Sequence, residues 1–565
     1  MSLGEGIKAG ELDVASVDEE PQADVRRFAA TSIVVLLGTS IPFLWVAWDE
    51  WTGRIDPLRS IAGAPNTIYD VQARAIMHGH FWIPPGSIKY DAFVAHGHQY
   101  TYFGIFPSLL RIPVLLFTSS LDGRLSELSI TGAWIVTALF CSLLLWRLRI
   151  FLRGNAALGW LEASTYGLLL VAILIGSVLV FLASRPDTPT EDEAWSVALF
   201  CGTLFALVGV IERPSWRRVA LCGSLVLLTD LNRATTGYAA VLATLLVALW
   251  FALGREGQPL RHWALPIAGA ALVPMAIGCA INMVKFGLLF GAPFSSQVLF
   301  QIQGLQKING GHYFSLHWLP STLSDYVDPA NFSFSSVFPY LNLPSQSSGL
   351  FGGQPTAGIP LSMPLLFVAG LIGVTTTFMP GQGKPFRALR LLLIASAAPA
   401  AAILLFGWIF EQYVADFVPL LVFAAMIGLV DVWRRLASRP RSTTRLVPVV
   451  AGALTLWSVW ANLGFSVAPG IYESSTQVAN YIKIQRAFSD VTGHPLDHKV
   501  IVSSQIPNPA PVGTLFVKGR CQALYLAWAA VPKSSFAGLA YLPVERAPDT
   551  PICDSLIERS STTKR

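Results

Sequence analysis

The segment 66–78 contains residue types that could transfer a proton. Its periodicity predicts a helix, and Asp70 and Arg74 stand four residues apart on one face of it. A carboxylate beside a cleft can act as a general base, whereas the plainer interpretation is a surface ion pair worth roughly 0.3 kcal/mol. We take Asp70 as the first candidate base. Four nearby acids stay open as alternatives: Asp49, Glu50, Asp56 and Asp91.

A second acidic segment, 185–195, contains Glu191, Asp192 and Glu193 in succession, directly before an apolar run. This placement predicts that Glu193 begins a helix and faces the same site, as a second candidate catalytic acid. A solvated acidic loop is the alternative. The helix dipole stabilises an acid at a helix start in either case, so position alone leaves both interpretations open.

Three cations near the same surface could bind a phosphate group. Arg233 lies in a polar turn between two short apolar runs, Lys285 follows the end of another run, and Arg74 is the third. The planar guanidinium group suits bidentate contact with phosphate better than an ammonium group does. The alternative is that these long side chains only extend toward the membrane surface.

Metal and nucleotide chemistry have weak support. His-Gly-His occurs twice, at 78–80 and 96–98, and four imidazoles could bind zinc. No third ligand type is fixed by spacing, so no cofactor is certain and a divalent metal remains open. The sequence contains neither a Gly-x-x-x-x-Gly-Lys-Ser/Thr phosphate loop nor an Asp-x-Asp pair. A nucleotide-bearing donor is therefore not indicated.

The elements that position these residues are membrane helices. Hydrophobic residues make up 53% of the 565 residues and charged residues 13%, about half the charged fraction of a soluble domain. The net charge of +5 is explained by basic loops and requires no nucleic-acid partner. The composition therefore predicts an α-helical polytopic membrane protein that contacts lipid.

Eleven apolar runs are long enough to cross a bilayer. They are 29–48, 128–147, 161–183, 194–211, 217–231, 237–253, 264–282, 361–379, 391–409, 414–433 and 446–466. The loops between them are alternately basic and non-basic, and basic loops stay in the cytoplasm. This predicts a multi-pass protein of the plasma (inner) membrane with a cytoplasmic N-terminus and an extracytoplasmic C-terminus.

One further apolar run, 104–121, contains Pro107, Arg111 and Pro113. An Arg at mid-bilayer costs about 3 kcal/mol or more, and a twelfth span would place the basic loops outside. We therefore expect a helix in the membrane interface, with Arg111 reaching lipid headgroups.

The predicted domains follow from these spans. Residues 1–28 form a disordered cytoplasmic tail, 29–467 the transmembrane domain with outer loops 49–127 and 283–360, and 468–565 an extracytoplasmic domain. Strand patterns at 499–504, 514–519 and 523–527 predict a small β-rich fold for that last domain. Cys521 and Cys553 could form a disulfide there.

Four stretches carry a family resemblance. They are Tyr69-Asp70-x-Gln-Ala-Arg-Ala-x-x-x-Gly79, followed by Pro84-Pro-Gly-Ser and Tyr102-Phe-Gly-x-Phe-Pro107; Glu193-Ala-Trp195; Asn282-x-x-Lys-Phe-Gly287; and Tyr413-x-x-Asp416-x-x-Pro419. The chain resembles the GT-C superfamily of integral membrane glycosyltransferases, in particular actinobacterial-type members, over most of 29–466. It departs at Gln412, where related chains often have Arg.

The resemblance implies a GT-C-like fold and an inverting transfer of sugar from a polyprenyl-phosphate donor to a glycan, lipid or protein acceptor in the cell envelope. It implies Asp70 or Glu193 as base and Arg233, Lys285 and Arg74 at the donor phosphate. Substrate would contact Trp82, Tyr102, Tyr413 and Asp416, although aromatics at such sites also serve as interfacial anchors. Two other classes remain: a lipid-linked glycan transporter or flippase, and a non-catalytic glycan-binding scaffold.

Overall fold

The structure is a computed structural model. It describes residues 22–48, 58, 68–88, 91–254, 259–298, 312–334, 338–343, 352–353, 356–437, 439–467 and 487–488, together with three strands in the C-terminal tail. Of the predicted disordered tail 1–28, residues 1–21 lie outside the described residues, whereas residues 22–28 are helical as the start of α1 (Gln22–Ala47), so the prediction is wrong for them. Three of the alternative bases, Asp49, Glu50 and Asp56, also lie outside the described residues, as does Cys553.

Eight helices in the described part are long and apolar enough to cross a membrane. They comprise α1 (Gln22–Ala47), α4 (Ser126–Arg153), α5 (Trp160–Leu174) continued by α6 (Val178–Ser184), α7 (Thr188–Glu212), α9 (Ala234–Leu253), α10 (Ala264–Phe286), α15 (Lys384–Leu404) and α17 (Arg441–Val467). The prediction of a helical polytopic membrane protein is therefore confirmed.

The other three predicted spans coincide with shorter or more charged helices: α8 (Trp216–Asn232), α14 (Pro364–Phe378) and α16 (Val418–Leu436). α14 and α16 pack closely because glycine lines their contact. A Cβ atom at Gly373 would lie 1.9 Å from the Ala424 carbonyl oxygen, and one at Gly428 would lie 2.1 Å from that of Ala369. Inside a bilayer the hydrophobic effect does not drive helices together, so their association depends on close van der Waals packing, which small residues permit.

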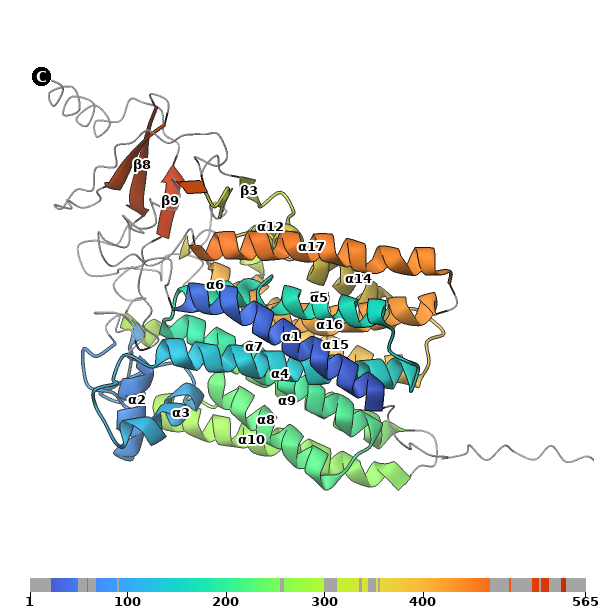
Figure 1. The fold of residues 1–565 in the computed structure, drawn as a ribbon. Helices are drawn as coiled ribbons and strands as arrows, with labels where there is room; N and C mark the ends of the chain where they lie inside the picture. The colour runs from blue at the N-terminus through green and yellow to red at the C-terminus, as the bar shows by residue number, and fades with distance from the viewer. Residues whose placement is uncertain are drawn as a thin grey trace, which may run out of the picture.

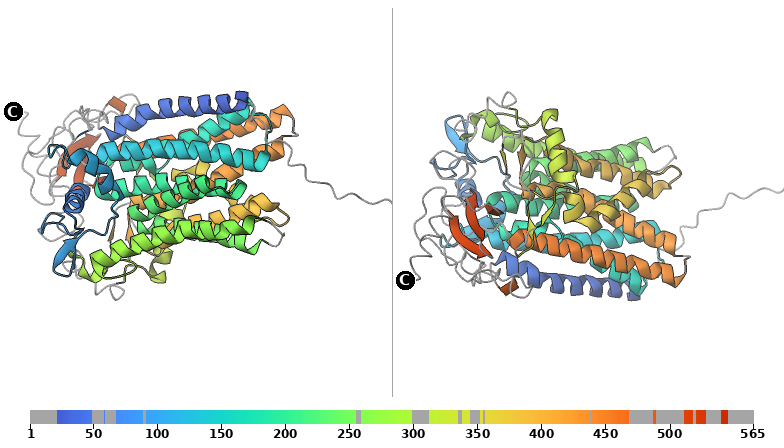
Figure 2. Two further views of the ribbon diagram at one scale, coloured as in Figure 1. Left: turned by 90° about the horizontal axis from the view of Figure 1, so that it is seen from below. Right: turned by 90° about the horizontal axis from the view of Figure 1, so that it is seen from above.

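The long helices run roughly parallel between two ends of one bundle (Figure 1), and two further views show the same alignment (Figure 2). The basic residues gather at the end where α1 begins: Arg153 ends α4, Arg217 lies in the first turn of α8, Lys384 begins α15 and Arg434 lies in the last turn of α16. The opposite end bears α2 (Ile68–Met77) and α3 (Phe106–Leu115). All the candidate chemistry lies toward that second end, which we call the site end.

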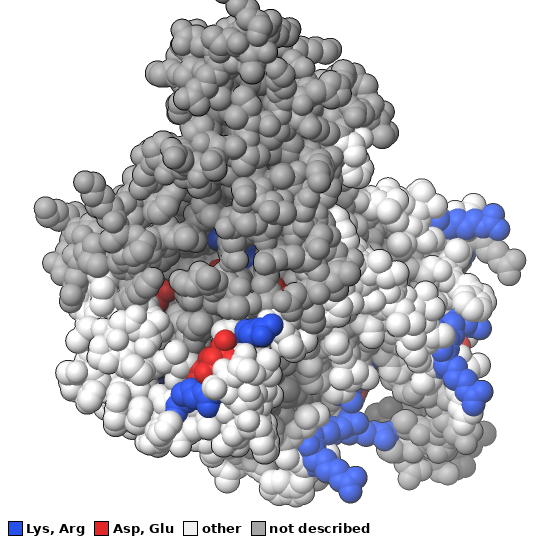
Figure 3. Space-filling model, turned by 60° about the vertical axis from the view of Figure 1, so that its left-hand side comes forward, with Lys and Arg blue, Asp and Glu red and all other residues white. Residues whose placement is uncertain are grey.

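At the site end, α2 and α3 pack against each other as a hairpin of short helices. The ten residues of α3 cover only about 15 Å, half of a hydrocarbon core, so this run is not a span of its own. Its buried side includes Arg111, while Leu110, Val114 and Phe117 are exposed. Figure 3 brings this end forward and shows a small mixed group of charged side chains among uncharged ones.

Short elements complete the loops. They are β1 (Phe93–Ala95) paired antiparallel with β2 (His98–Tyr100), β3 (Ser333–Phe334) with β4 (Leu341–Asn342), β5 (Gly352–Gly353) parallel with β6 (Trp408–Ile409), the helices α12 (Leu319–Val327) and α13 (Ile359–Ser362), and the 3-10 turns η4 (Pro259–Trp263), η5 (Phe294–Ser296), η8 (Leu316–Trp318) and η9 (Glu411–Asp416). The last of these, η9, supplies Tyr413 and Asp416 to the site.

The C-terminal tail contains a three-stranded antiparallel sheet in the order β7 (Pro511–Val517), β8 (Arg520–Ala527), β9 (Ala540–Val544). β7 and β8 overlap the strands expected at 514–519 and 523–527, and Phe516 pairs with Cys521 across them. The strand expected at 499–504 lies outside the described residues. The assignment of a separate domain over 468–565 stays a prediction.

Candidate functional site

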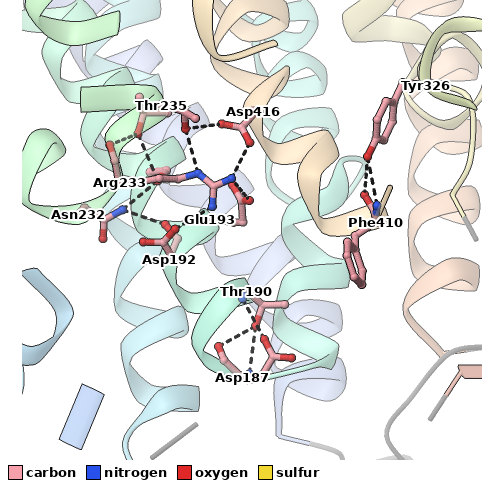
Figure 4. Close-up of polar contacts among 12 residues, drawn as sticks. Asp187, Thr190, Asp192, Glu193, Asn232, Arg233, Thr235, Tyr326, Phe410 and Asp416 are labelled. Atoms are coloured by element: carbon pink, nitrogen blue, oxygen red, sulfur yellow. Dashed lines mark hydrogen bonds and ion pairs between the residues drawn. The ribbon is translucent and has the colours of Figure 1, made fainter. Parts of the chain in front are cut away.

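The site centres on the guanidinium group of Arg233, which lies between α8 and α9. Its Nη1 donates to Asp192 Oδ2 at 2.8 Å and its Nη2 to Asp416 Oδ2 at 2.9 Å. Glu193 Oε1 lies 2.7 Å from Nη2, and Nε donates to Thr235 Oγ1 at 3.0 Å. Three carboxylates from α7 and η9 thus share one cation (Figure 4).

Charge in this cluster is not balanced within the described residues. Asp192, Glu193 and Asp416 are all buried, and Arg233 can neutralise one of three negative charges. Burial raises the pKa of Asp416, while Arg233 and the Thr235 hydroxyl oppose that rise. Burial lowers the pKa of Arg233, but the surrounding carboxylates outweigh it and the net pKa is raised. The site therefore retains protons or attracts a positively charged group.

Glu193 differs from its two neighbours in its hydrogen bonds. Asp192 Oδ1 accepts from the Tyr69 hydroxyl at 3.3 Å, and Asp416 Oδ1 accepts from Thr235 at 3.1 Å. Neither oxygen of Glu193 has a hydrogen-bond donor among the described residues, because its short distance to Arg233 is an ion pair without hydrogen-bond geometry. Glu193 is thus a buried carboxylate whose lone pairs are unoccupied by directed donors.

The start of α7 explains why these acids gather here. Asp187 caps the helix by accepting from the Thr190 backbone N–H at 2.9 Å, and the Thr190 hydroxyl accepts from the Asp187 N–H at 3.1 Å. This capping box fixes residues 191–193 in the first turns of α7.

A close backbone approach lies beside Arg233 on another side of the site. A Cβ at Gly104 would lie 2.0 Å from the Asn232 carbonyl oxygen. Only glycine permits this approach beside Arg233.

A second cluster joins the α2–α3 hairpin to α7. Arg111 Nε lies 2.9 Å from Asp70 Oδ1, and its two terminal nitrogens donate to Glu191 at 2.6 and 2.7 Å. One expectation is corrected here, and one alternative is excluded. Arg111 is 3% exposed and contacts buried carboxylates instead of headgroups, because these acids need a cation once they are removed from water. The acids after 190 are likewise buried and do not form a solvated loop.

Asp70 does not form the ion pair with Arg74 that the spacing of four residues suggests. Its partner is Arg111 and not Arg74, and its Oδ2 also accepts from the Gly123 N–H at 2.7 Å. Burial raises the pKa of Asp70 to about 6, while Arg111 and the Gly123 N–H oppose that rise. Arg74 binds Asp122 at 2.9 Å and the carbonyl oxygens of Leu115 and Thr118. Arg74 therefore anchors the end of α3.

Lys285, near the end of α10, is a buried cation with a neutral partner. Its Nζ donates to the Phe103 carbonyl oxygen at 3.2 Å and lies 5.3 Å from the ring of Phe286. No ion pair involves Lys285 in the part of the chain that the structure describes. Asn282, one turn earlier, donates to the carbonyl oxygens of Leu288 and Gly291 and so shapes the loop after α10.

The predicted substrate-binding residues divide into two places. Tyr413 lies with its ring 5.9 Å from the Arg233 guanidinium, and Asp416 belongs to the Arg233 cluster. Tyr102 stacks on Phe103 at 4.2 Å, within the segment that contacts Lys285. Trp82, in contrast, lies in a separate stack between His80 at 3.8 Å and His98 at 4.7 Å.

Metal ligation has no support in the described residues. No group of three or more His, Cys, Asp or Glu side chains there could hold an ion. Of the two His-Gly-His triplets, His80 and His98 stack on Trp82, and His78 Nδ1 hydrogen-bonds with the Arg74 carbonyl oxygen. In the described structure, two histidines of these triplets therefore belong to an aromatic stack, and a third makes a backbone hydrogen bond.

Five members of the two clusters were not among the predicted site residues: Tyr69, Arg111, Glu191, Asp192 and Thr235. A signal for the charged ones was present in the sequence. Acids at the boundary of an apolar run must find cationic or hydrogen-bonding partners, and Arg111 and Arg233 are cations at comparable boundaries. If the acids at 191–193 had been considered together with Arg111 and Arg233, the sequence would have indicated buried ion pairs between them.

No protein-family model matches the sequence, and no curated protein does. Among solved structures, the chain is similar to ArnT from Cupriavidus metallidurans in the apo state, with 13% sequence identity, a TM-score of 0.38, and coverage of 82% of this chain and 80% of that chain. An overlap of this size establishes no residue correspondence, so the roles of individual residues rest on contacts within this chain.

Proposed function

We propose that this chain is a membrane glycosyltransferase of the GT-C type. It moves a sugar from a polyprenyl-phosphate donor to a glycan, lipid or protein acceptor of the cell envelope. The resemblance of four sequence stretches to that superfamily supports the class. The observation that carries the mechanism is Glu193, a buried carboxylate without a hydrogen-bond donor among the described residues, held against Arg233.

Glu193 is the general base of this proposal, ahead of Asp70. It takes the proton of an acceptor hydroxyl while that oxygen forms a bond to the anomeric carbon and the bond from that carbon to the phosphate oxygen breaks. The phosphate departs with the bonding electrons, and the configuration is inverted. Asp70 is less available because its Oδ2 already accepts from the Gly123 N–H at 2.7 Å, whereas its Oδ1, like the Glu193 oxygens, meets a guanidinium group in an ion pair without a directed hydrogen bond. Glu193 is closed off from solvent, so neighbouring side chains move when the acceptor enters.

Lys285 is the principal phosphate contact of the proposal. Among the described residues, the buried Lys285 ammonium group contacts a carbonyl oxygen and an aromatic ring but no carboxylate, so it can bind an anion without first breaking an ion pair. The donors of Arg233, in contrast, are engaged by Asp192, Asp416 and Thr235. Arg233 instead stabilises negative charge on the departing phosphate. Arg74 instead contacts Asp122 and the carbonyl oxygens of Leu115 and Thr118, so it is not a phosphate contact in this proposal.

The outer side of the membrane is the proposed side of reaction. Basic residues gather at the end of the bundle opposite the Arg233 cluster, and the positive-inside tendency assigns that basic end to the cytoplasm. Tyr102, Tyr413 and Asp416 then face the sugar and acceptor from the extracytoplasmic side, and Trp82 offers an aromatic face near the same end.

The test is transfer by purified protein in lipid nanodiscs supplied with radiolabelled polyprenyl-phosphate sugars and an envelope extract as acceptor. Wild type should release polyprenyl phosphate and label the acceptor. Glu193→Gln should lower turnover by roughly 10²–10⁴-fold. Glu162→Gln is the matched control, because Glu162 is buried but pairs with Arg149 at the basic end. Turnover of Glu193→Gln equal to that of the control would refute this base, and Asp70→Asn tests the other acid.

A further inference from the structure

The α2–α3 hairpin contacts two successive acids of α7. Arg111 of α3 binds both oxygens of Glu191, and Tyr69 of α2 donates its hydroxyl hydrogen to Asp192 Oδ1 at 3.3 Å. The Arg111 guanidinium also lies 5.2 Å from the Tyr69 ring centroid, so the two contacts support one another. The hydrogen bond between Tyr69 and Asp192, which are 123 residues apart in the sequence, thereby links the hairpin to the Arg233 cluster.

Tyr69 is the one donor to Asp192 Oδ1 in the described part of the chain, and Asp192 Oδ2 accepts from Arg233. The phenol is fully buried, and burial next to acids raises its pKa well above 10. The hydroxyl therefore stays protonated and remains a donor at every pH at which the protein would work. Asp192 is held from both sides in a single orientation.

We infer that Tyr69 is a positioning residue that keeps Asp192 on Arg233 and so leaves Glu193 free of a directed hydrogen bond. The inference rests on the proposed function, in which Glu193 is the base. A base needs an available lone pair, and Arg233 is the donor nearest to it. Asp192 and Asp416 fix the directions in which the Arg233 guanidinium hydrogens point. Glu193 is then stabilised by the positive charge of Arg233, and its lone pairs stay free of a directed hydrogen bond.

Removal of the Tyr69 hydroxyl should change this balance. Asp192 would lose its second donor and could rotate away from Nη1. The guanidinium group would then turn toward Glu193 and donate a directed hydrogen bond to it. Proton transfer to Glu193 would slow, because the lone pair would be occupied, whereas the donor phosphate would still meet Lys285 on α10.

The matched pair of variants is Tyr69→Phe and Tyr166→Phe. Tyr166 is also fully buried and donates to a carboxylate, Glu162 Oε1, at 2.8 Å, but at the basic end. Each change removes one buried hydroxyl–carboxylate hydrogen bond and leaves the ring in place. Tyr69→Phe should lower kcat about ten- to a hundredfold with the donor KM within about twofold. Tyr166→Phe should cost similar thermal stability and leave kcat unchanged.

Equal kcat values for the two variants would overturn the inference while leaving the proposed function in place. Absence of turnover by wild type would instead refute the proposed function. A cryo-EM structure of Tyr69→Phe tests the inference independently of activity. Rotation of Asp192 and a directed Arg233–Glu193 hydrogen bond are expected, and an unchanged cluster overturns the inference.

Discussion

Arg111→Met is the sharpest test of the buried ion pairs at the site end. Methionine keeps much of the side-chain volume, but it leaves Asp70 and Glu191 without their shared cation. Arg111 is 3% exposed and makes contacts of 2.9, 2.6 and 2.7 Å with the two carboxylates. Removing one partner of such a buried pair typically costs 3–5 kcal/mol, because an uncompensated charge remains. At roughly 2 °C per kcal/mol for a large domain, the unfolding midpoint should fall by about 6–10 °C.

Arg74→Met is the matched control, on the partner helix of the same hairpin. Its ion pair with Asp122 is solvent-exposed, with side-chain exposures of 30% and 42%, and exposed pairs contribute about 1 kcal/mol or less. Thermal unfolding followed by a thiol-reactive dye suits this protein, since three thiols become accessible only on unfolding: Cys141, Cys201 and Cys222.

The pH dependence of the Arg111→Met loss is a further part of the same prediction. Burial raises the pKa of Asp70 from its ordinary 3.8 to about 6, so Asp70 is largely neutral at pH 5 and charged at pH 8. A neutral Asp70 needs no cation, so the destabilisation should be smaller at pH 5 than at pH 8. Equal midpoint losses for Arg111→Met and Arg74→Met at pH 8 would refute the buried-pair account.

Three further outcomes are expected. Gly104→Ala places a Cβ 2.0 Å from the Asn232 carbonyl oxygen, so it should displace the chain beside Arg233 and lower kcat. Gly269→Ala is the control, because its Cβ meets nothing within 4 Å. Transfer assays of both variants should show the larger loss of kcat for Gly104→Ala. Burial raises the pKa of Glu411 from 4.5 to about 7. A raised acid pKa gives stability that is present below pH 4.5 and lost as pH rises through about 7, so Glu411→Gln should remove up to about 3 kcal/mol of that loss, seen as a flatter profile of unfolding midpoint from pH 5 to 8. Lys285→Met should raise the donor KM about tenfold or more with little change in kcat, because it removes a contact made before and during reaction; a normal KM would argue against phosphate binding there.

The helical architecture could be predicted from sequence because the bilayer imposes a length on every apolar run. All eleven expected runs coincide with helices, and the Arg111 argument against a span at 104–121 agrees with the ten-residue α3. The weaker cases, α8 and α14, are 17 and 15 residues long. Both are shorter than the roughly 20 residues that a straight membrane span needs.

The partners within the site could not be predicted with the same certainty. Glu193 and Arg233 were predicted from their places beside apolar runs and Tyr413 and Asp416 from the family resemblance, and the structure brings the four together. The partner of Asp70 was missed because Arg74 stands four residues away, whereas Arg111 reaches Asp70 only through the packing of α3 on α2. Spacing in the sequence predicts which residues share one face of a helix. It does not predict which other element packs on that face.

A cryo-EM structure with a non-hydrolysable polyprenyl-phosphate sugar analogue in nanodiscs tests the central claim most directly. The account predicts the phosphate density beside Lys285 at the site end, the anomeric carbon between that phosphate and Glu193, and the isoprenoid chain running along lipid-facing helices. Phosphate density among the arginines at the ends of α4 and α16, with the Glu193 region empty, would contradict it.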